Sequence, residues 1–343
     1  MFTFTPMRNG FRRAAPFALI TAFGLAACGG GYSSSTPYGM SGATGAAASK
    51  LFAADSPHMA IGSLVNPNPG TGMITVDRVI MGSVYTGLSN NIGSLALDPV
   101  LDYLYVGNGT SIRVFYMASM AYGDAIPARV ITNNPASGNT GSLFLDTTNN
   151  RLYVGDNVFG VRVFDNASMI SGPTASTRVI TGLGTIHGVA VDTGSNDILY
   201  VSNTTSTPSN EINLFTASMA NDPATPIKTI TPTVSAANHA VGGISLDATN
   251  DVLYVAGFVD GMVMVFGSVH NTTGGAIVPT KTLTFPSTIS SVAIDPVNNR
   301  LYAVSLGAVY ILNGASAATD PITVTAILVP AGGGFTAVAV NPN

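Results

Sequence analysis

Five aspartates recur along the sequence at nearly regular intervals, each at the end of a short apolar segment. They are Asp98, Asp146, Asp192, Asp247 and Asp295, with Asn341 in the same place of a last segment, and the intervals are 48, 46, 55, 48 and 46 residues. An array of carboxylates could bind cations or transfer protons. Each Asp, however, precedes a turn-forming stretch, where an Asp side chain accepts hydrogen bonds from backbone N–H groups. We therefore predict a structural role for these residues.

A second set of polar residues follows the segments of the type Leu104-Tyr105-Val106, two positions after each triplet. The set consists of Asp55, Asn108, Asp156, Asn203, Gly257 and Ser305. Oxygen atoms of this kind suit Ca²⁺, which takes about six to eight of them. Since Asn and Asp also end strands and start turns, the structural interpretation is favoured. No cofactor is expected, and Ca²⁺ remains the alternative.

The candidate binding residues lie between these markers. Five positions before each marker stand Gly93, Gly141, His187, Gly242, Ser290 and Thr336, of which only His187 is ionisable. Long connections at 203–211 and 231–241 contain Glu211, the only Glu, and His239. Because long loops on a rigid scaffold often bind ligands, we predict a ligand-binding face. It comprises His187, Glu211, His239, Asn203, Asp156 and Asn108, with no catalytic residue and no metal ligand assigned. A lone histidine beside small residues is nevertheless more often a hydrogen-bonded structural group than a ligand.

The elements that must position these residues are four short strands in each repeat. Strand a alternates large and small apolar residues, as in Val189-Ala190-Val191, and strand b is a β-prone triplet such as Leu199-Tyr200-Val201. Strand c resembles Val161-Arg162-Val163-Phe164, and strand d begins with a basic residue, as in Arg178-Val179-Ile180. We interpret that basic residue as a charge that protects an exposed sheet edge from aggregation.

Repeats of this length with four strands each predict the blades of a β-propeller. Five units are complete, and a sixth is divided between the two ends of the repeat region. Residues 51–54, 59–61 and 78–80 supply its strands b, c and d, and residues 336–340 supply its strand a. We therefore predict an all-β, six-bladed propeller over residues 51–343, with four antiparallel strands per blade and a ring closed by strand pairing.

The first residues have the composition of an export signal. Arg8, Arg12 and Arg13 precede an apolar stretch at 14–25, which is short for a membrane span. Leu25-Ala26-Ala27-Cys28 resembles the lipobox of bacterial lipoproteins, where cleavage precedes a cysteine that then carries lipid, and Cys28 is the only cysteine. We predict a signal peptide at 1–27, lipidation of Cys28 and a flexible tether at 28–50. An ordinary secretory signal is the alternative.

By the same resemblance, Gly rather than Asp at position 29 indicates the outer membrane of a Gram-negative bacterium. Without residues 1–27 the chain keeps 10 basic against 17 acidic residues, a formal charge of −7. This charge argues against nucleic acid and anionic lipid as partners. A protein or glycan partner is expected.

Two further features suggest a family. Leu104-Tyr105-Val106-Gly107-Asn108 resembles the YVTN repeat of lactonase-like propellers, and Asp295-Pro296 resembles the turn of NHL repeats. In most such propellers the ligand face carries the d-to-a and b-to-c loops. The resemblance implies either a non-catalytic binding scaffold or a lactonase-type hydrolase, metal-dependent or not, with His187 or His239 as base. No arginine falls in these loops and no nucleophile elbow is present, which favours the scaffold. Lateral assembly of propellers is a third possibility.

Overall fold

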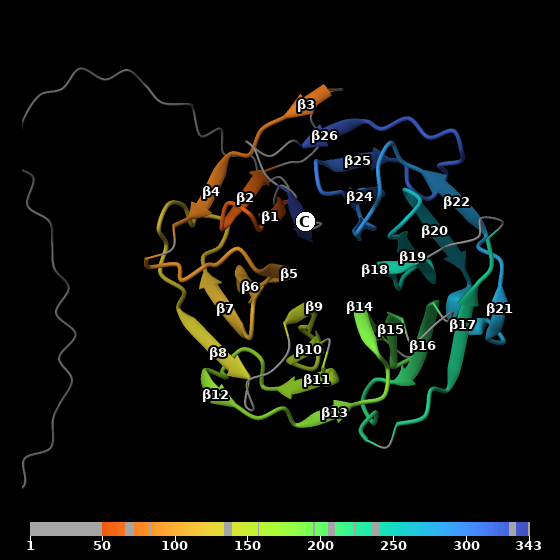
Figure 1. Ribbon diagram of the computed structural model, residues 1–343, viewed down its shortest axis with the longest axis horizontal. Coiled ribbons are helices and arrows are strands. Elements are labelled where there is room, and N and C mark those ends of the chain that lie inside the picture. The colour runs from red at the N-terminus through yellow and green to blue at the C-terminus, as the bar shows by residue number, and fades with distance from the viewer. Residues whose placement is uncertain are drawn as a thin grey trace, which may run out of the picture. The chain divides into compact units, whose positions relative to one another are not determined.

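The computed structural model describes residues 50–65, 72–82, 84–133, 139–156, 158–194, 196–204, 210–222, 224–234, 240–328 and 334–341. In this part of the chain six sheets are arranged around a common axis (Figure 1). Each sheet has four successive antiparallel strands, with the innermost strand nearest the axis. The predicted six-bladed, all-β propeller is therefore confirmed. The described residues contain no helix that is long and apolar enough to cross a membrane.

The blades are numbered in chain order, and their strands are given from the innermost, a, to d. Blade 1 consists of β27 (Phe335–Asn341), β1 (Lys50–Asp55), β2 (Ala60–Val65) and β4 (Arg78–Met81). Blade 2 consists of β5 (Ile92–Asp98), β6 (Tyr103–Asn108), β7 (Ser111–Tyr116) and β8 (Arg129–Asn133). Blade 3 consists of β9 (Thr140–Asp146), β10 (Arg151–Asp156), β11 (Gly160–Asp165) and β13 (Arg178–Ile180).

The second half of the ring has the same order. Blade 4 consists of β14 (Thr185–Asp192), β15 (Ile198–Thr204), β16 (Asn210–Thr216) and β17 (Lys228–Pro232). Blade 5 consists of β18 (Val241–Asp247), β19 (Val252–Gly257), β20 (Met262–Gly267) and β22 (Lys281–Thr284). Blade 6 consists of β23 (Ser291–Asp295), β24 (Arg300–Val304), β25 (Val309–Asn313) and β26 (Ala326–Leu328).

The ring is closed by pairing between the two ends of the repeat region, as predicted. β27 lies antiparallel to β1, with Ala53 opposite Val338 and Lys50 opposite Asn341. Phe52 of β1 is fully buried against residues of blade 2, so blade 1 packs as the other blades do. Strand a therefore comes from the C-terminal part of the chain and strands b to d from its N-terminal part.

The hydrophobic core lies between neighbouring blades. One cluster joins Val161 and Val163 of blade 3 to Leu199 and Phe215 of blade 4, and the other clusters likewise join adjacent blades. The tyrosines of the b-strand triplets are among the largest fully buried side chains; they are Tyr105, Tyr153, Tyr200, Tyr254 and Tyr302. Strand a lies nearest the axis, where the sheets are closest together, and there its alternating small and large residues pack against the neighbouring blades.

Three short outer strands were not predicted. β3 (Gly72–Ile74), β12 (Gly172–Thr174) and β21 (Gly275–Ile277) pair in parallel with strand d of the preceding blade, namely with β26, β8 and β17. They belong to the c-to-d connections of blades 1, 3 and 5.

In blades 2, 4 and 6 the c-to-d connection contains an aspartate instead of a short strand. These residues are spaced 98 positions apart and are Asp124, Asp222 and Asp320. Asp222 accepts hydrogen bonds from the backbone N–H of Thr181 at 2.8 Å and from its hydroxyl at 2.7 Å, and Asp320 binds Thr284 at 2.8 and 2.7 Å. The two kinds of c-to-d connection alternate around the ring, so the structure repeats every two blades.

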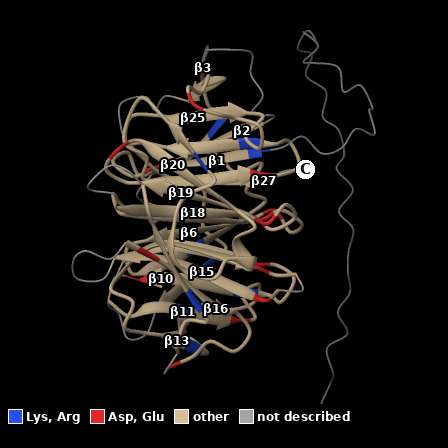
Figure 2. Ribbon diagram, turned by 90° about the vertical axis from the view of Figure 1, so that its right-hand side faces the viewer, with Lys and Arg blue, Asp and Glu red and all other residues tan. Residues whose placement is uncertain are grey.

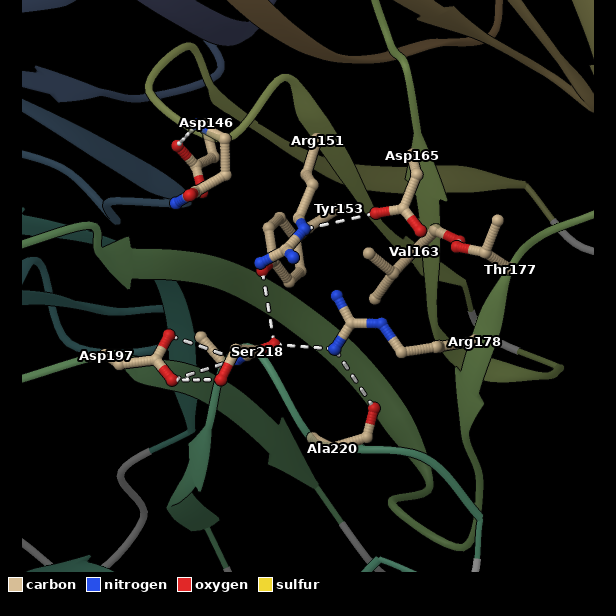
Figure 3. Close-up of polar contacts among 12 residues, drawn as sticks. Asp146, Arg151, Tyr153, Val163, Asp165, Thr177, Arg178, Asp197, Ser218 and Ala220 are labelled. Carbon is tan, nitrogen blue, oxygen red and sulfur yellow. Dashed lines mark hydrogen bonds and ion pairs between the residues drawn. The ribbon is translucent and has the colours of Figure 1, made fainter.

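The basic residues of strand d do not protect an open edge, so that interpretation was wrong. Arg129 is 8% exposed, and its Nη1 donates to the carbonyl oxygens of Ala167 at 2.9 Å and Ile170 at 2.8 Å in the next blade. Arg178 likewise binds Ala217 at 2.7 Å and Ala220 at 3.4 Å (Figure 3). These carbonyl groups end a helical turn after strand c, and such groups attract cations. The basic residues therefore join blades.

Candidate functional site

The recurring aspartates at the ends of the a strands stabilise turns, as predicted. In Asp146 one carboxylate oxygen accepts the backbone N–H of Asn149 at 2.9 Å, and the other accepts its side-chain amide at 2.8 Å. The same pair of bonds joins Asp247 to Asn250 and Asp295 to Asn298. The carboxylates thus bind the a-to-b turns, on the opposite side of the ring from the b-to-c turns.

Asp156, one of the predicted binding residues, is fully buried. Its Oδ1 accepts the backbone N–H groups of Val158 at 2.7 Å and Phe159 at 3.0 Å, and its Oδ2 lies 2.6 Å from Nη2 of Arg162. Burial lowers the pKa of Arg162, and the Asp156 carboxylate opposes that shift. Both carboxylate oxygens are therefore bonded within the blade-3 hairpin.

Asn108 and Asn203 are also buried and bonded to the protein itself. The Asn108 side chain accepts from the backbone N–H of Ser89 at 2.9 Å and from its hydroxyl at 3.0 Å. Asn203 donates to the carbonyl oxygen of Leu183 at 2.7 Å and accepts from Asn213 at 2.9 Å. Each residue ties strand b to the connection that arrives from the preceding blade, so the three predicted oxygen donors lie apart, in blades 2, 3 and 4.

The centre of the ring contains a cavity of about 200 Å³. Four of the residues predicted at its mouth besides His187 line it, namely Gly93, Gly141, Ser290 and Thr336, whereas Gly243 takes the place expected for Gly242. Several of its hydroxyl groups link the innermost strands: Thr336 donates to the carbonyl oxygen of Ile92 at 2.8 Å, and Ser142 accepts from the N–H of Val189 at 3.0 Å. Hydroxyl groups of the cavity wall thus link neighbouring blades.

His187 lies at an irregularity of β14, where the pairing with β15 shifts between Ile186 and Gly188. Its side chain lines the cavity, and its Nε2 lies 3.2 Å from the Thr204 hydroxyl. Burial lowers the pKa of His187, which favours the neutral ring at pH 7. A neutral imidazole with a hydroxyl partner can accept a proton or a hydrogen bond.

The other two predicted residues of this group have different surroundings. Glu211 is opposite Asn203 in the pairing of β15 with β16, and its carboxylate lies 3.5 Å from the Asn213 amide. His239 lies outside the described residues. Among the residues that the structure describes, no group of three or more His, Cys, Asp or Glu side chains is placed to hold a metal ion.

Exposed apolar residues at the b-to-c turns were not predicted. We call the side of the ring that carries the b-to-c turns and the d-to-a connections the loop face. On it Val158 is 65% exposed, Phe258 and Val259 are each 53% exposed, and Leu306 is 72% exposed. They come from blades 3, 5 and 6. The sequence could have indicated them, because each of these apolar residues comes one or two positions after Asp156, Gly257 or Ser305.

Comparisons with known proteins agree with this architecture. No family model matches the sequence, and no curated protein matches it. A solved structure titled "Crystal structure of Nidogen/Laminin Complex" is similar, with a TM-score of 0.60 and 14% identity over 85% of this chain and 98% of that chain. At this identity the similarity supports the fold alone. The chain therefore has the fold of a six-bladed β-propeller.

Proposed function

We propose that the chain is an exported lipoprotein, anchored through Cys28, whose propeller is a non-catalytic scaffold that binds a protein or glycan partner at the loop face. The observation that carries the binding role is the exposure of Val158, Phe258, Val259 and Leu306 at the turns of three blades. Large apolar side chains that stay exposed on one face of a protein can mark an interaction site. The similar solved propeller is titled as part of a nidogen/laminin complex, which is consistent with protein binding.

The chemistry of the cavity supports binding over catalysis. Besides His187, the polar side chains of its wall are serine and threonine hydroxyls, several of which already bond the neighbouring blade. A hydrolase needs a base, a nucleophile or activated water, and groups that stabilise the developing charge, all held in one place. His187 supplies a base, and its hydrogen-bond partner is the Thr204 hydroxyl rather than a carboxylate. We therefore expect no turnover of lactones.

The anchor is proposed from the sequence, since Cys28 lies outside the described residues. A lipid on Cys28 attaches the chain to a bilayer, because each buried methylene group contributes about 0.8 kcal/mol. Fractionation of cells that export the wild type and Cys28→Ala tests it. The wild type is expected in the membrane fraction and the variant in the soluble fraction. Equal distribution of the two would rule out lipidation at this residue.

The binding face is tested by envelope extracts passed over the immobilised protein. Phe258→Ser and Leu306→Ser remove apolar surface from the loop face, whereas Val297→Ser, at a residue that is 72% exposed in an a-to-b turn, is the matched control. We expect the partner retained by the wild type and the control to be lost with the two loop-face variants. Retention by all four proteins would place the interaction elsewhere and contradict the assignment of the face.

A further inference from the structure

Among the residues that the structure describes, seven exposed apolar side chains belong to one edge of blade 2. It is formed by the residues around the a-to-b turn and the c-to-d connection, and we call it the blade-2 patch. Its members and their exposed fractions are Val100 84%, Leu101 46%, Tyr116 38%, Met117 65%, Met120 54%, Tyr122 71% and Ile126 72%. This edge is opposite the loop face, so the patch is separate from the proposed partner site.

The internal repeat provides a comparison within the same molecule. The positions of Val100 and Leu101 are occupied by Thr148 and Asn149 in blade 3. Tyr116, Met117 and Tyr122 likewise correspond to Asp165, Asn166 and Ser171. At these five positions blade 3 therefore folds with polar residues, whereas the place of Met120 is taken by Met169, which is 78% exposed. Apolar side chains at these five positions are not a requirement of the fold, and their exposure in blade 2 needs another explanation.

One cross-strand pair illustrates the difference. In blade 2, Tyr103 and Tyr116 stack with ring centroids 4.0 Å apart and planes 11° apart. The equivalent residues of blade 3 are Arg151 and Asp165, which form an ion pair at 3.1 Å (Figure 3). An aromatic pair thus replaces a charged pair at the same place. Arg129 lies behind the stack, with its guanidinium carbon 5.5 Å from the Tyr116 ring centroid, which holds the rings in place.

The patch is also ordered by hydrogen bonds beneath it. Asp102 accepts from the backbone N–H of Ser119 at 3.1 Å and from its hydroxyl at 2.6 Å. Arg78 of blade 1 donates to the carbonyl oxygen of Met120 at 3.0 Å. Both bonds hold the turn that presents Met117 and Met120. The apolar side chains are therefore presented on a fixed backbone.

The position of the patch indicates its occupant. β1 begins at Lys50, opposite Asn341 at the end of β27, and this is the edge that carries the a-to-b turns. The 22 residues from Cys28 to residue 49 therefore join the propeller on the same edge as the patch, one blade away. As the tether that the sequence predicts, they would span about 25 Å on average. A lipid on Cys28 would keep this edge close to the bilayer.

We propose that the blade-2 patch rests on the bilayer to which the chain is anchored, with Met117, Met120 and Tyr122 in the interfacial region. This inference rests on the proposed lipid anchor. Tyr and apolar side chains favour the boundary between headgroups and acyl chains. Acidic residues are frequent along the edge where the C-terminal strand ends (Figure 2), which disfavours anionic lipid. The occupant is therefore a zwitterionic lipid surface.

The test uses the lipidated full-length product in phosphatidylcholine vesicles. Cys28 is the only native cysteine, so Met120→Cys can be labelled with an environment-sensitive fluorophore once the native thiol carries lipid. Leu306→Cys, at an exposed residue of the loop face, is the matched control. We expect a blue shift and at least about threefold stronger quenching by a lipid-borne quencher at position 120 than at position 306. Introducing the blade-3 residues with Leu101→Asn and Tyr122→Ser should abolish the difference without changing the melting temperature.

The possible outcomes separate the two proposals. A protein that floats with vesicles but leaves the label at position 120 in water refutes the patch and leaves the anchor intact. A protein that does not float refutes both. A blue shift that depends on protein concentration and not on lipid indicates a second copy of the chain as the occupant, and it too contradicts the inference.

Discussion

The Tyr105 hydroxyl lies 3.1 Å from Nη2 of Arg129, and both side chains also donate to the carbonyl oxygen of Ala167 in the next blade. Burial raises the pKa of Tyr105, and Arg129 opposes that shift. Tyr153 and Arg178 converge on Ala217 of the following blade in the same way. The tyrosine of strand b and the cation of strand d thus act together to join successive blades.

Removal of this cation should destabilise the propeller. Arg129→Ala removes the guanidinium donor to the carbonyl groups of Ala167 and Ile170 and leaves Ala167 with the Tyr105 hydroxyl alone, so we expect a loss of about 3 kcal/mol in unfolding free energy. Arg129→Lys should lose less, because one ammonium keeps part of the contact. Arg78→Ala, which removes the more exposed bond to Met120, is the control and should cost about 1 kcal/mol or less. Urea unfolding measures all three, and equal effects of Arg129→Ala and Arg78→Ala would contradict this role.

The buried ion pair of blade 3 should behave as a coupled unit. Asp156 and Arg162 have side chains that are 0% and 6% exposed. Arg162→Met leaves a buried carboxylate without its cation, so we expect a loss of about 3 kcal/mol. Asp156→Asn keeps an oxygen for the turn N–H groups but leaves the guanidinium unpaired. A double-mutant cycle by denaturant unfolding should give the double variant a smaller loss than the sum of the single variants, and strict additivity would count against coupling.

Ring closure should be essential for cooperative unfolding. A chain that ends at residue 334 lacks β27, so β1 loses its inner partner and Leu51, Phe52 and Ala53 lose their cover. We expect a broad, low-temperature transition and aggregation, because an unpaired apolar strand edge recruits other chains. A chain that lacks only residues 342–343 is the control and should melt like the wild type. Calorimetry and size-exclusion chromatography distinguish the two, and a sharp transition of the shorter chain would refute the closure.

The stability contributed by His187 should depend on pH. Burial lowers its pKa below the ordinary value of 6.5, so the unfolded chain binds more protons in the window between the two pKa values. The stabilisation is therefore fully present above about pH 6.5 and is lost as the pH falls through this window. We expect the melting temperature to fall less between pH 7.5 and pH 5 in His187→Gln than in the wild type. Parallel pH profiles would show that the ring is not held neutral.

Much of the fold could be predicted because local pattern and repeat length agree with each other. Alternation in Val189-Ala190-Val191 identifies an innermost strand, and Asp295 identifies the turn that follows it, so register and blade order come from the sequence itself. The outer strands could not be found in this way. Gly172-Pro173-Thr174 of β12 has no strand-like pattern, and its pairing with β8 of the preceding blade is a tertiary contact that the sequence does not reveal.

The candidate site was less predictable, because contacts between blades decide it. Arg129 was assigned to an open edge, since the sequence does not reveal that the next blade covers strand d. Asn203 and Asp156 were predicted from their residue types to belong to the ligand-binding face. Their hydrogen bonds to Leu183 and Val158 depend on the folded structure and could not be predicted in this way. The Asp–Asn turns could be predicted because they involve residues only three positions apart.

The central claim is that the loop face binds a partner, and photo-crosslinking in cells that export the protein tests it most directly. A photoreactive amino acid at position 258 or 306 should give a discrete adduct of higher mass that contains a second molecule, whereas the same group at position 297, on the opposite edge, should not. Absence of adducts from both loop-face positions, or equal adducts from all three, would contradict the claim.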